Sequence, residues 1–193
     1  MSFLTKFEGK FYIKCEFETI LTQIKTMELI KLKNRKKIQG VAIAAIIAAS
    51  YVVLTFVANA LGLASGAIQI RLSEALTILP IFTPYAIPGL FIGCLLANIL
   101  TGCVLWDIIL GSLATLIGSV FTYLLRKNKL LAVVPPILSN TIIVPVVLIY
   151  FYNLEGVYWY FALTVFIGEV ISCGILGTFL RKSLEKRNVI NKF

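Results

Sequence analysis

The chain alternates long apolar runs with short polar segments, a pattern that predicts a series of membrane-spanning helices. The first run, from Ile38 to Ala60, exceeds the roughly 20 apolar residues that a helix needs to cross a bilayer. Three later runs of similar length predict helices at about 107–125, 130–150 and 158–180.

A further charge-free run extends from Ala75 to Trp106 and is interrupted by three prolines. Proline lacks the backbone donor and disfavours helix just before it. We therefore expect a short helix over roughly 72–83, a turn at Thr83-Pro84-Tyr85, and another helix over roughly 87–103. The pattern as a whole predicts one membrane domain of six helices, residues 38–182.

Polar and basic segments flank this domain, at residues 1–37 and 183–193. The first is no secretory signal, because the apolar run that follows is longer than a signal's core of roughly 7–15 residues. Two alternatives stay open for it. Residues 11–30 form an amphipathic helix on the membrane surface, or translation starts at Met27 and leaves a short basic leader.

The distribution of cations predicts the orientation. Every lysine and arginine except Arg71 lies in the N-terminal segment, the loop 126–129 or the tail from Arg181. Cytoplasmic loops are the ones enriched in these residues, so six spans with both termini inside account for all three groups. The net charge of +9 is therefore a sign of topology, and we expect no nucleic acid partner.

Composition supports an all-α integral membrane protein and argues against an enzyme. The chain is 59% hydrophobic and 14% charged, with a mean hydropathy of +0.94, whereas a soluble domain is about half apolar and a quarter charged. It has no histidine and no phosphate-binding glycine loop. The four cysteines are scattered, so we expect packing residues and neither a metal site nor a disulfide framework: Cys15, Cys94, Cys103 and Cys173.

The segment Ile68–Leu76 carries the first charges after the first apolar run. Arg71 and Glu74 are three residues apart, so they share a face if a helix starts here, and they can then pair. The alternation of apolar and polar residues before them favours a short extended segment. We interpret this stretch as an outer loop that enters a helix and binds a ligand, or as a loop held by one ion pair.

Polar groups within the apolar runs are the other candidates for a site, because such groups are costly in lipid unless partnered. With the assumed topology nearly all lie in the outer half or near the midplane, which indicates a pocket that opens outward. The candidate substrate-binding residues are Gln69, Arg71, Glu74, Asn98, Asp107, Asn140 and Glu169.

Several of these residues have a purely structural alternative. Asp107 suits the N-cap of its helix, and Asn98 and Asn140 suit hydrogen bonds between helices. Glu169, near the middle of the last helix, is the hardest to explain structurally. A carboxylate and amides suit a planar solute rich in donors, such as a guanine-like edge, and rings near the outer interface could stack on it: Trp106, Tyr158, Trp159 and Tyr160.

Small residues recur at every fourth position in the first helix, as Ala44 with Ala48 and Ala45 with Ala49. This spacing lets helix backbones approach closely in lipid. It fits either packing within this protein or docking to another membrane protein.

Several ordered motifs across about residues 38–182 resemble the queuosine-precursor transporter family QueT. They are Ile68–Leu76, Ile87–Cys94, Asp107–Thr115, Pro135–Asn140 and Ile167–Glu169. The resemblance implies a substrate-binding (S) component of an energy-coupling factor (ECF) transporter, a six-helix protein of the bacterial plasma membrane without its own ATPase activity.

The resemblance also implies partners and a ligand. Such components work with a transmembrane coupling protein and two cytoplasmic ATPases that use ATP, and their first helix docks the coupling protein, here through Ala44, Ala45, Ala48 and Ala49. The implied solute is a 7-deazaguanine: the aminomethyl precursor, its nitrile, or queuine. A cationic aminomethyl arm would favour Glu74 or Asp107, and no cofactor is expected on this chain.

Two other functions fit the residues. One is a proton-coupled secondary transporter in which Glu169 carries the proton, although we find no internal repeat of the kind such folds commonly show. The other is a non-transporting scaffold, in which Glu169 only packs. A membrane enzyme lacks the usual catalytic groups.

Overall fold

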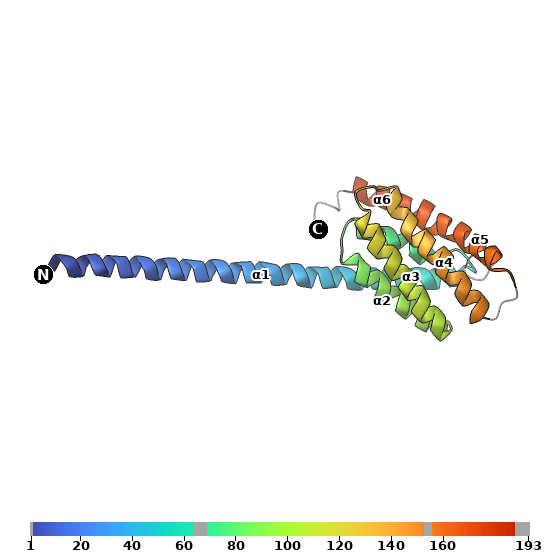
Figure 1. Ribbon diagram of the computed structural model, residues 1–193, viewed down its shortest axis with the longest axis horizontal. Helices are drawn as coiled ribbons and strands as arrows, with labels where there is room; N and C mark the ends of the chain where they lie inside the picture. Colours follow the sequence, from blue (N-terminus) through green and yellow to red (C-terminus); the bar gives the residue numbers. More distant parts are fainter. Residues whose placement is uncertain (1, 64–68, 153–155, 188–193) are drawn as a thin grey trace. The chain divides into compact units, whose positions relative to one another are not determined.

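The computed structural model describes residues 2–63, 69–152 and 156–187, with side chains from residue 25 onward except Ile30. These residues are helical and include no strand (Figure 1). The chain divides into two compact units, Met1–Val41 and Ala42–Phe193. The first unit lies within helix α1, Ser2–Ala60, so the interfacial segment expected at 11–30 is helical as part of this longer element.

Four described segments are long and apolar enough to cross a membrane: Lys25–Ala60, Leu105–Leu124, Leu131–Tyr150 and Tyr158–Lys186. Two apolar helices are shorter, Leu72–Ile81 and Ala86–Leu100. The second unit is therefore a bundle of apolar helices, as expected for a multi-pass membrane protein.

The short helices follow the prolines. Leu72–Ile81 is a 3-10 helix, η1, which includes Pro80. A turn separates it from α2, Ala86–Leu100, which is close to the expected 87–103. Of the extended segment expected before η1, Ile68 lies outside the described residues, and Arg71 is extended, with φ and ψ of −94° and 95°.

The later helices begin and end near the expected positions. Helix α3 spans Leu105–Leu124, and α4 spans Val134–Tyr150 after a 3-10 turn, η2, at Leu131–Val133. The last helix extends six residues beyond its expected end and consists of α5 (Tyr158–Glu169), η3 (Val170–Leu176) and α6 (Gly177–Lys186). Of these, η3 is π-helical and begins directly after Glu169.

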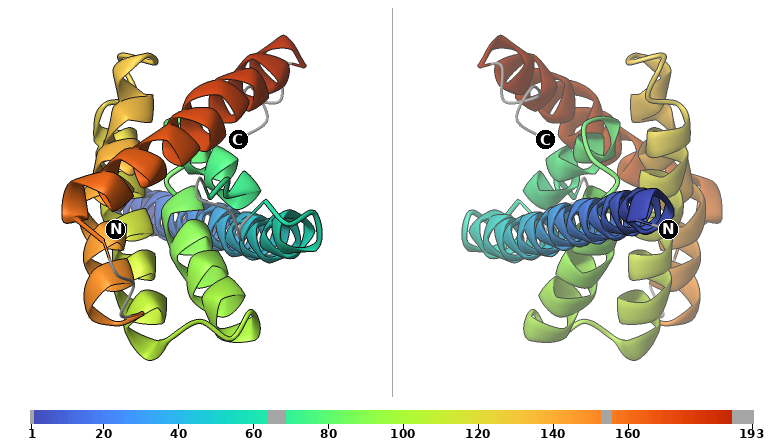
Figure 2. Two further views of the ribbon diagram at one scale, coloured as in Figure 1. Left: turned by 90° about the vertical axis from the view of Figure 1, so that its right-hand side faces the viewer. Right: turned by 90° about the vertical axis from the view of Figure 1, so that its left-hand side faces the viewer.

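Helix α3 is central to the second unit. It packs against α2 on one side and α4 on the other, and α4 in turn packs against α5. The 3-10 helix η1 lies against α3, η3 and α6, and Figure 2 shows α5, η3 and α6 as one continuous helix. The interior thus includes residues of η1 and α3 in contact with each other, and residues of α4 in contact with both α3 and α5.

Helices α1 and α2 approach closely through small residues. A side chain on Gly93 would place its Cβ 2.8 Å from the Cβ of Tyr51 and 3.0 Å from the Cα of Ala48. Ala48 is buried, while Ala45 and Ala49 are exposed. The two alanine pairs therefore differ, because Ala44 and Ala48 pack internally on α2 and the other pair faces outward.

Candidate functional site

A cavity of about 310 Å³ lies between α1, α2, α3, α4 and the segment that leads into η1. A pocket of this size suits a small organic ligand. Its polar lining comes from five stretches of the chain that are far apart in sequence. The side chains most able to recognise a ligand are Tyr51, Gln69, Arg71, Asn98, Asp107 and Tyr152.

Arg71 and Asp107 are the charged side chains of this lining. Among described residues, Arg71 makes no ion pair, since the one ion pair found there joins Lys129 and Glu185 at 2.9 Å. Burial acts to lower the pKa of Arg71, but the negative charges of Asp107 and other neighbours outweigh it, so the pKa is raised. Arg71 therefore presents a permanent guanidinium to the cavity.

Asp107 is buried and accepts a hydrogen bond from the hydroxyl of Tyr152 at 3.1 Å. Burial, with the Asp107 carboxylate beside it, raises the pKa of Tyr152. The other carboxylate oxygen, Oδ1, has no partner among the described residues. Asp107 is not the N-cap of its helix, because α3 begins at Leu105 and Val104 occupies that position.

Among the described residues no ion pair joins Arg71 and Glu74, so the alternative of a loop held by that pair is not supported. Arg71 has extended backbone angles and lies just outside η1, so its side chain does not share the helical face of Glu74. Glu74 is fully buried instead. One of its oxygens, Oε1, accepts hydrogen bonds from the Tyr51 hydroxyl and, at 3.4 Å, from Thr115.

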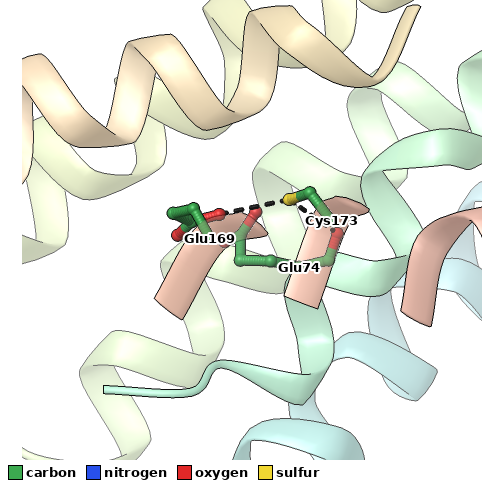
Figure 3. Close-up of side chains that lie close together, drawn as sticks. All are labelled: Glu74, Glu169 and Cys173. Atoms are coloured by element: carbon green, nitrogen blue, oxygen red, sulfur yellow. Dashed lines mark hydrogen bonds between the residues drawn. The ribbon is translucent and has the colours of Figure 1, made fainter. Parts of the chain in front are cut away.

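Glu169 and Asn140 meet Glu74 in the interior. The amide of Asn140 donates to Glu169 Oε1 at 3.0 Å, and the thiol of Cys173 donates to Glu169 Oε2 at 3.1 Å. Cys173 also lies 3.4 Å from the backbone oxygen of Glu74. Figure 3 shows Glu74, Glu169 and Cys173 facing one another from η1 and the last helix. We call Glu74, Asn140, Glu169 and Cys173 the buried acidic cluster.

This cluster brings ligand atoms of Glu74, Glu169 and Cys173 within 4.8 Å of one another. Two ionised carboxylates so close together in a low-dielectric interior repel each other strongly. No lysine or arginine pairs with either of them in the part of the chain whose side chains are described. The arrangement can therefore hold a proton, a cation or the N–H groups of a ligand.

The structure divides the residues expected to bind the solute into two layers. Gln69, Arg71, Asn98 and Asp107 line the cavity, and the remaining three, Glu74, Asn140 and Glu169, belong to the buried acidic cluster. Tyr51 connects the layers, because it lines the cavity and donates to Glu74.

Sequence reasoning missed several residues and misplaced others. Cys173 was expected only to pack, yet it bonds to Glu169, four residues earlier on the same helix, and this spacing was a usable signal.

The aromatic rings expected to stack on the solute do not line the cavity. Trp106 stacks on Phe151 with ring centroids 5.0 Å apart, and Trp159 and Tyr160 are exposed. The aromatic rings of the cavity are Tyr51 and Tyr152 instead.

Comparison with known proteins points to one family. The sequence model of the family described as "QueT transporter" matches residues 41–186. A relative named queuosine precursor transporter QueT, from Lactococcus lactis subsp. cremoris, is 36% identical over 85 residues, which are 44% of this chain and 49% of the relative. The matched region thus spans about half the length of that relative, and no solved structure matches the chain. Because the family model covers most of the sequence, the chain belongs to the QueT transporter family.

Proposed function

We propose that this protein is the membrane-embedded substrate-binding component of an ECF-type importer. It captures a queuosine precursor at the outer face of the bacterial plasma membrane, and a coupling protein with two ATPases drives uptake. Membership of a transporter family supports transport. The printed name of the Lactococcus relative supports the class of solute.

The observation that carries the proposal is the polar cavity of about 310 Å³. A 7-deazaguanine presents a ring carbonyl, several N–H donors and, in the aminomethyl precursor, an ammonium group. The Arg71 guanidinium, which forms no ion pair among the described residues, suits the carbonyl. Asp107 suits the ammonium group, because its Oδ1 has no partner among the same residues. The amides of Gln69 and Asn98 offer both donors and acceptors at the remaining sides.

The proposed topology is six spans with both termini in the cytoplasm. The four long apolar helices then cross the membrane together with the shorter pair, η1 and α2. Arg126, Lys127 and Lys129 between α3 and α4 lie on the cytoplasmic side with the basic termini. The cavity, lined by residues at the other ends of α2 and α3, faces outward.

Thermal unfolding of the detergent-purified protein tests the proposal. The ligands are queuine, the aminomethyl and nitrile precursors, guanine, and riboflavin as an unrelated solute. A ligand at 100 times its Kd stabilises the fold by roughly 2.7 kcal/mol if it binds only the native state. We expect stabilisation by at least one deazaguanine, none by riboflavin, and a loss of affinity of about tenfold or more in Arg71→Gln.

The matched control is Arg126→Gln, since Arg126 is an exposed residue that stacks on Tyr123 at 4.0 Å from its ring centroid. The Arg126→Gln protein should bind the deazaguanines with the same affinity as the unmodified protein. If folded protein is stabilised by no deazaguanine, the assignment of the solute is wrong.

The second candidate, a proton-coupled secondary transporter, is favoured by one observation: Glu74 and Glu169 lie close together without a paired cation among the described side chains. It predicts uptake into proteoliposomes that contain this chain alone and carry a proton gradient. Uptake that requires the ATPase partners and ATP would exclude it.

A further inference from the structure

The buried acidic cluster has more hydrogen-bond acceptors than its surroundings satisfy. Oε2 of Glu74 and Oδ1 of Asn140 are buried and have no partner among the described residues, and both residues are 0% exposed. Leaving such atoms unpaired costs about 1–3 kcal/mol each, and more when the group is charged. A partner that supplies donors is therefore expected at this position.

The donors that reach the two carboxylates already have acceptors. The Tyr51 hydroxyl and Thr115 donate to Oε1 of Glu74, the Asn140 amide donates to Glu169, and the Cys173 thiol lies on Glu169. A ligand that brings N–H or O–H groups, or a positive charge, would satisfy the acceptors that remain.

The buried acidic cluster adjoins the cavity through η1 and α4. Ser73 lines the cavity and Glu74 follows it in η1, while Val144 lines the cavity one helical turn from Asn140 on α4. One turn of α-helix rises 5.4 Å, which is comparable to the width of a fused two-ring base. Tyr51 forms the floor between the layers, since it touches both.

We propose that the buried acidic cluster is the deep end of the solute site and binds a planar edge that carries adjacent N–H donors, as guanine does. This inference rests on the proposed function and adds the orientation of the ligand. The N–H edge points inward to Glu74, Asn140 and Glu169, and the substituent on the five-membered ring points back to Asp107. Tyr51 shifts aside to admit the edge.

This orientation matches each acidic group to one end of the ligand. Glu169 and Glu74 together present several acceptor oxygens, which suits the two parallel N–H groups of a guanine edge. Asp107 lines the cavity beside Tyr152, so a cationic arm bound there stays within the polar cavity. A site built to bind substrate N–H groups rejects analogues that lack them, because its own polar atoms are then left unpaired.

The test compares two ligands on the unmodified protein by titration calorimetry. One is 7-aminomethyl-7-deazaguanine, and the other is the same compound without its 2-amino group. We expect the second compound to bind at least about tenfold more weakly. In Glu169→Gln, which replaces an acceptor with a donor, this preference should shrink to about twofold or less while the aminomethyl group still contributes to affinity.

The matched control is Glu185→Gln, the same chemical change at a residue that pairs with Lys129 near the end of α6. The Glu185→Gln protein should keep the full preference for the compound that carries the 2-amino group. A second variant, Asn140→Leu, should also reduce the preference, and the comparison of ligands on unmodified protein stays decisive if either variant fails to fold.

Three outcomes overturn the proposal. Equal affinity for both compounds in the unmodified protein means that the N–H edge is not bound here. Stoichiometric binding of Zn²⁺ alone that is lost in Cys173→Ala means that the cluster is a metal site. If neither compound nor any other deazaguanine binds, the proposed function fails, and this inference fails with it.

Discussion

Tyr51 is the residue on which the interior of the second unit depends most. It is 2% exposed, sits on α1, and donates its hydroxyl proton to the fully buried Glu74. A hydrogen bond to a buried carboxylate is worth more than one between neutral groups. Tyr51 thus lines the cavity and, through its hydroxyl, also contacts the buried acidic cluster.

Replacing Tyr51 with phenylalanine isolates the role of the hydroxyl. The ring still fills its space, but an oxygen of Glu74 loses its donor, so we expect a loss of about 1–3 kcal/mol in unfolding free energy. Denaturant unfolding in detergent measures it. Tyr150→Phe, at a residue that is 71% exposed, is the control and should change stability by less than about 0.5 kcal/mol. Equal effects of the two variants would argue against the buried hydrogen bond.

At this scale the sequence identified polar residues that the structure buries, such as Asn140 and Glu169, but not how they group. Asn140 and Glu169 were predicted as site residues from the sequence, because polar side chains are costly in lipid. Their separation from Arg71 and Asp107 into a buried layer depends on packing of η1 against η3, which leaves no periodic trace in the sequence. The hydrogen bond of Cys173 has one signal in the sequence, the four-residue spacing from Glu169, which is easily overlooked because cysteine is usually a small packing residue.

At the scale of elements, the contact between α1 and α2 depends on the absence of side chains at Gly89 and Gly93. A Cβ on Gly93 would meet Tyr51 and the backbone of Ala48. Neither can move away without displacing α1, and α1 carries the floor of the cavity. Close packing of α1 against α2 therefore affects the position of Tyr51 and with it the shape of the cavity.

Gly93→Ala should lower stability by about 1–3 kcal/mol, the usual range for an overpacked contact, and weaken solute binding. Unfolding temperature and ligand titration measure the two effects. Gly174→Ala is the matched control, because its Cβ would meet only a side-chain carbon of Val170 at an ordinary 3.7 Å. A Gly93→Ala protein as stable as this control would contradict the close packing.

The outward alanines allow a separate prediction. Ala45 and Ala49 are exposed, so leucine at both positions should leave folding and ligand binding unchanged. If the chain works with a coupling protein, the same double variant should no longer copurify with it. Ala48→Leu should instead disturb the fold, because Ala48 is buried against α2. Undiminished copurification of the double variant would place the docking surface elsewhere.

Helix positions were largely predictable because apolar length and proline determine them. The short helix before Pro84 and the helix after it both exist near the expected residues. Their finer geometry was not predictable. The 3-10 form of η1 and the start of α3 at Leu105 are decided by tertiary packing rather than by local residue preference.

At the scale of the whole molecule, the sequence predicts topology through charge alone. Cysteine labelling tests it in cells, with a membrane-impermeant maleimide and a parent chain in which Cys15 and Cys103 are serine. Val157→Cys, at an exposed residue just before α5, should react in intact cells. Lys127→Cys, between α3 and α4, should react only after permeabilisation. The reverse pattern would invert the proposed orientation.

The π-helical segment Val170–Leu176 has a consequence for how this chain tolerates changes in length. A π-helix closes its hydrogen bonds one residue later than an α-helix, so it holds a surplus residue. Deleting one residue from an ordinary α-helix turns everything beyond it by about 100°. Deleting one residue here would instead convert the segment to regular α-helix and leave the flanking helices α5 and α6 in place. If the deleted residue lies between Glu169 and Cys173, the shortened chain would keep its bundle and move Cys173 out of register with Glu169.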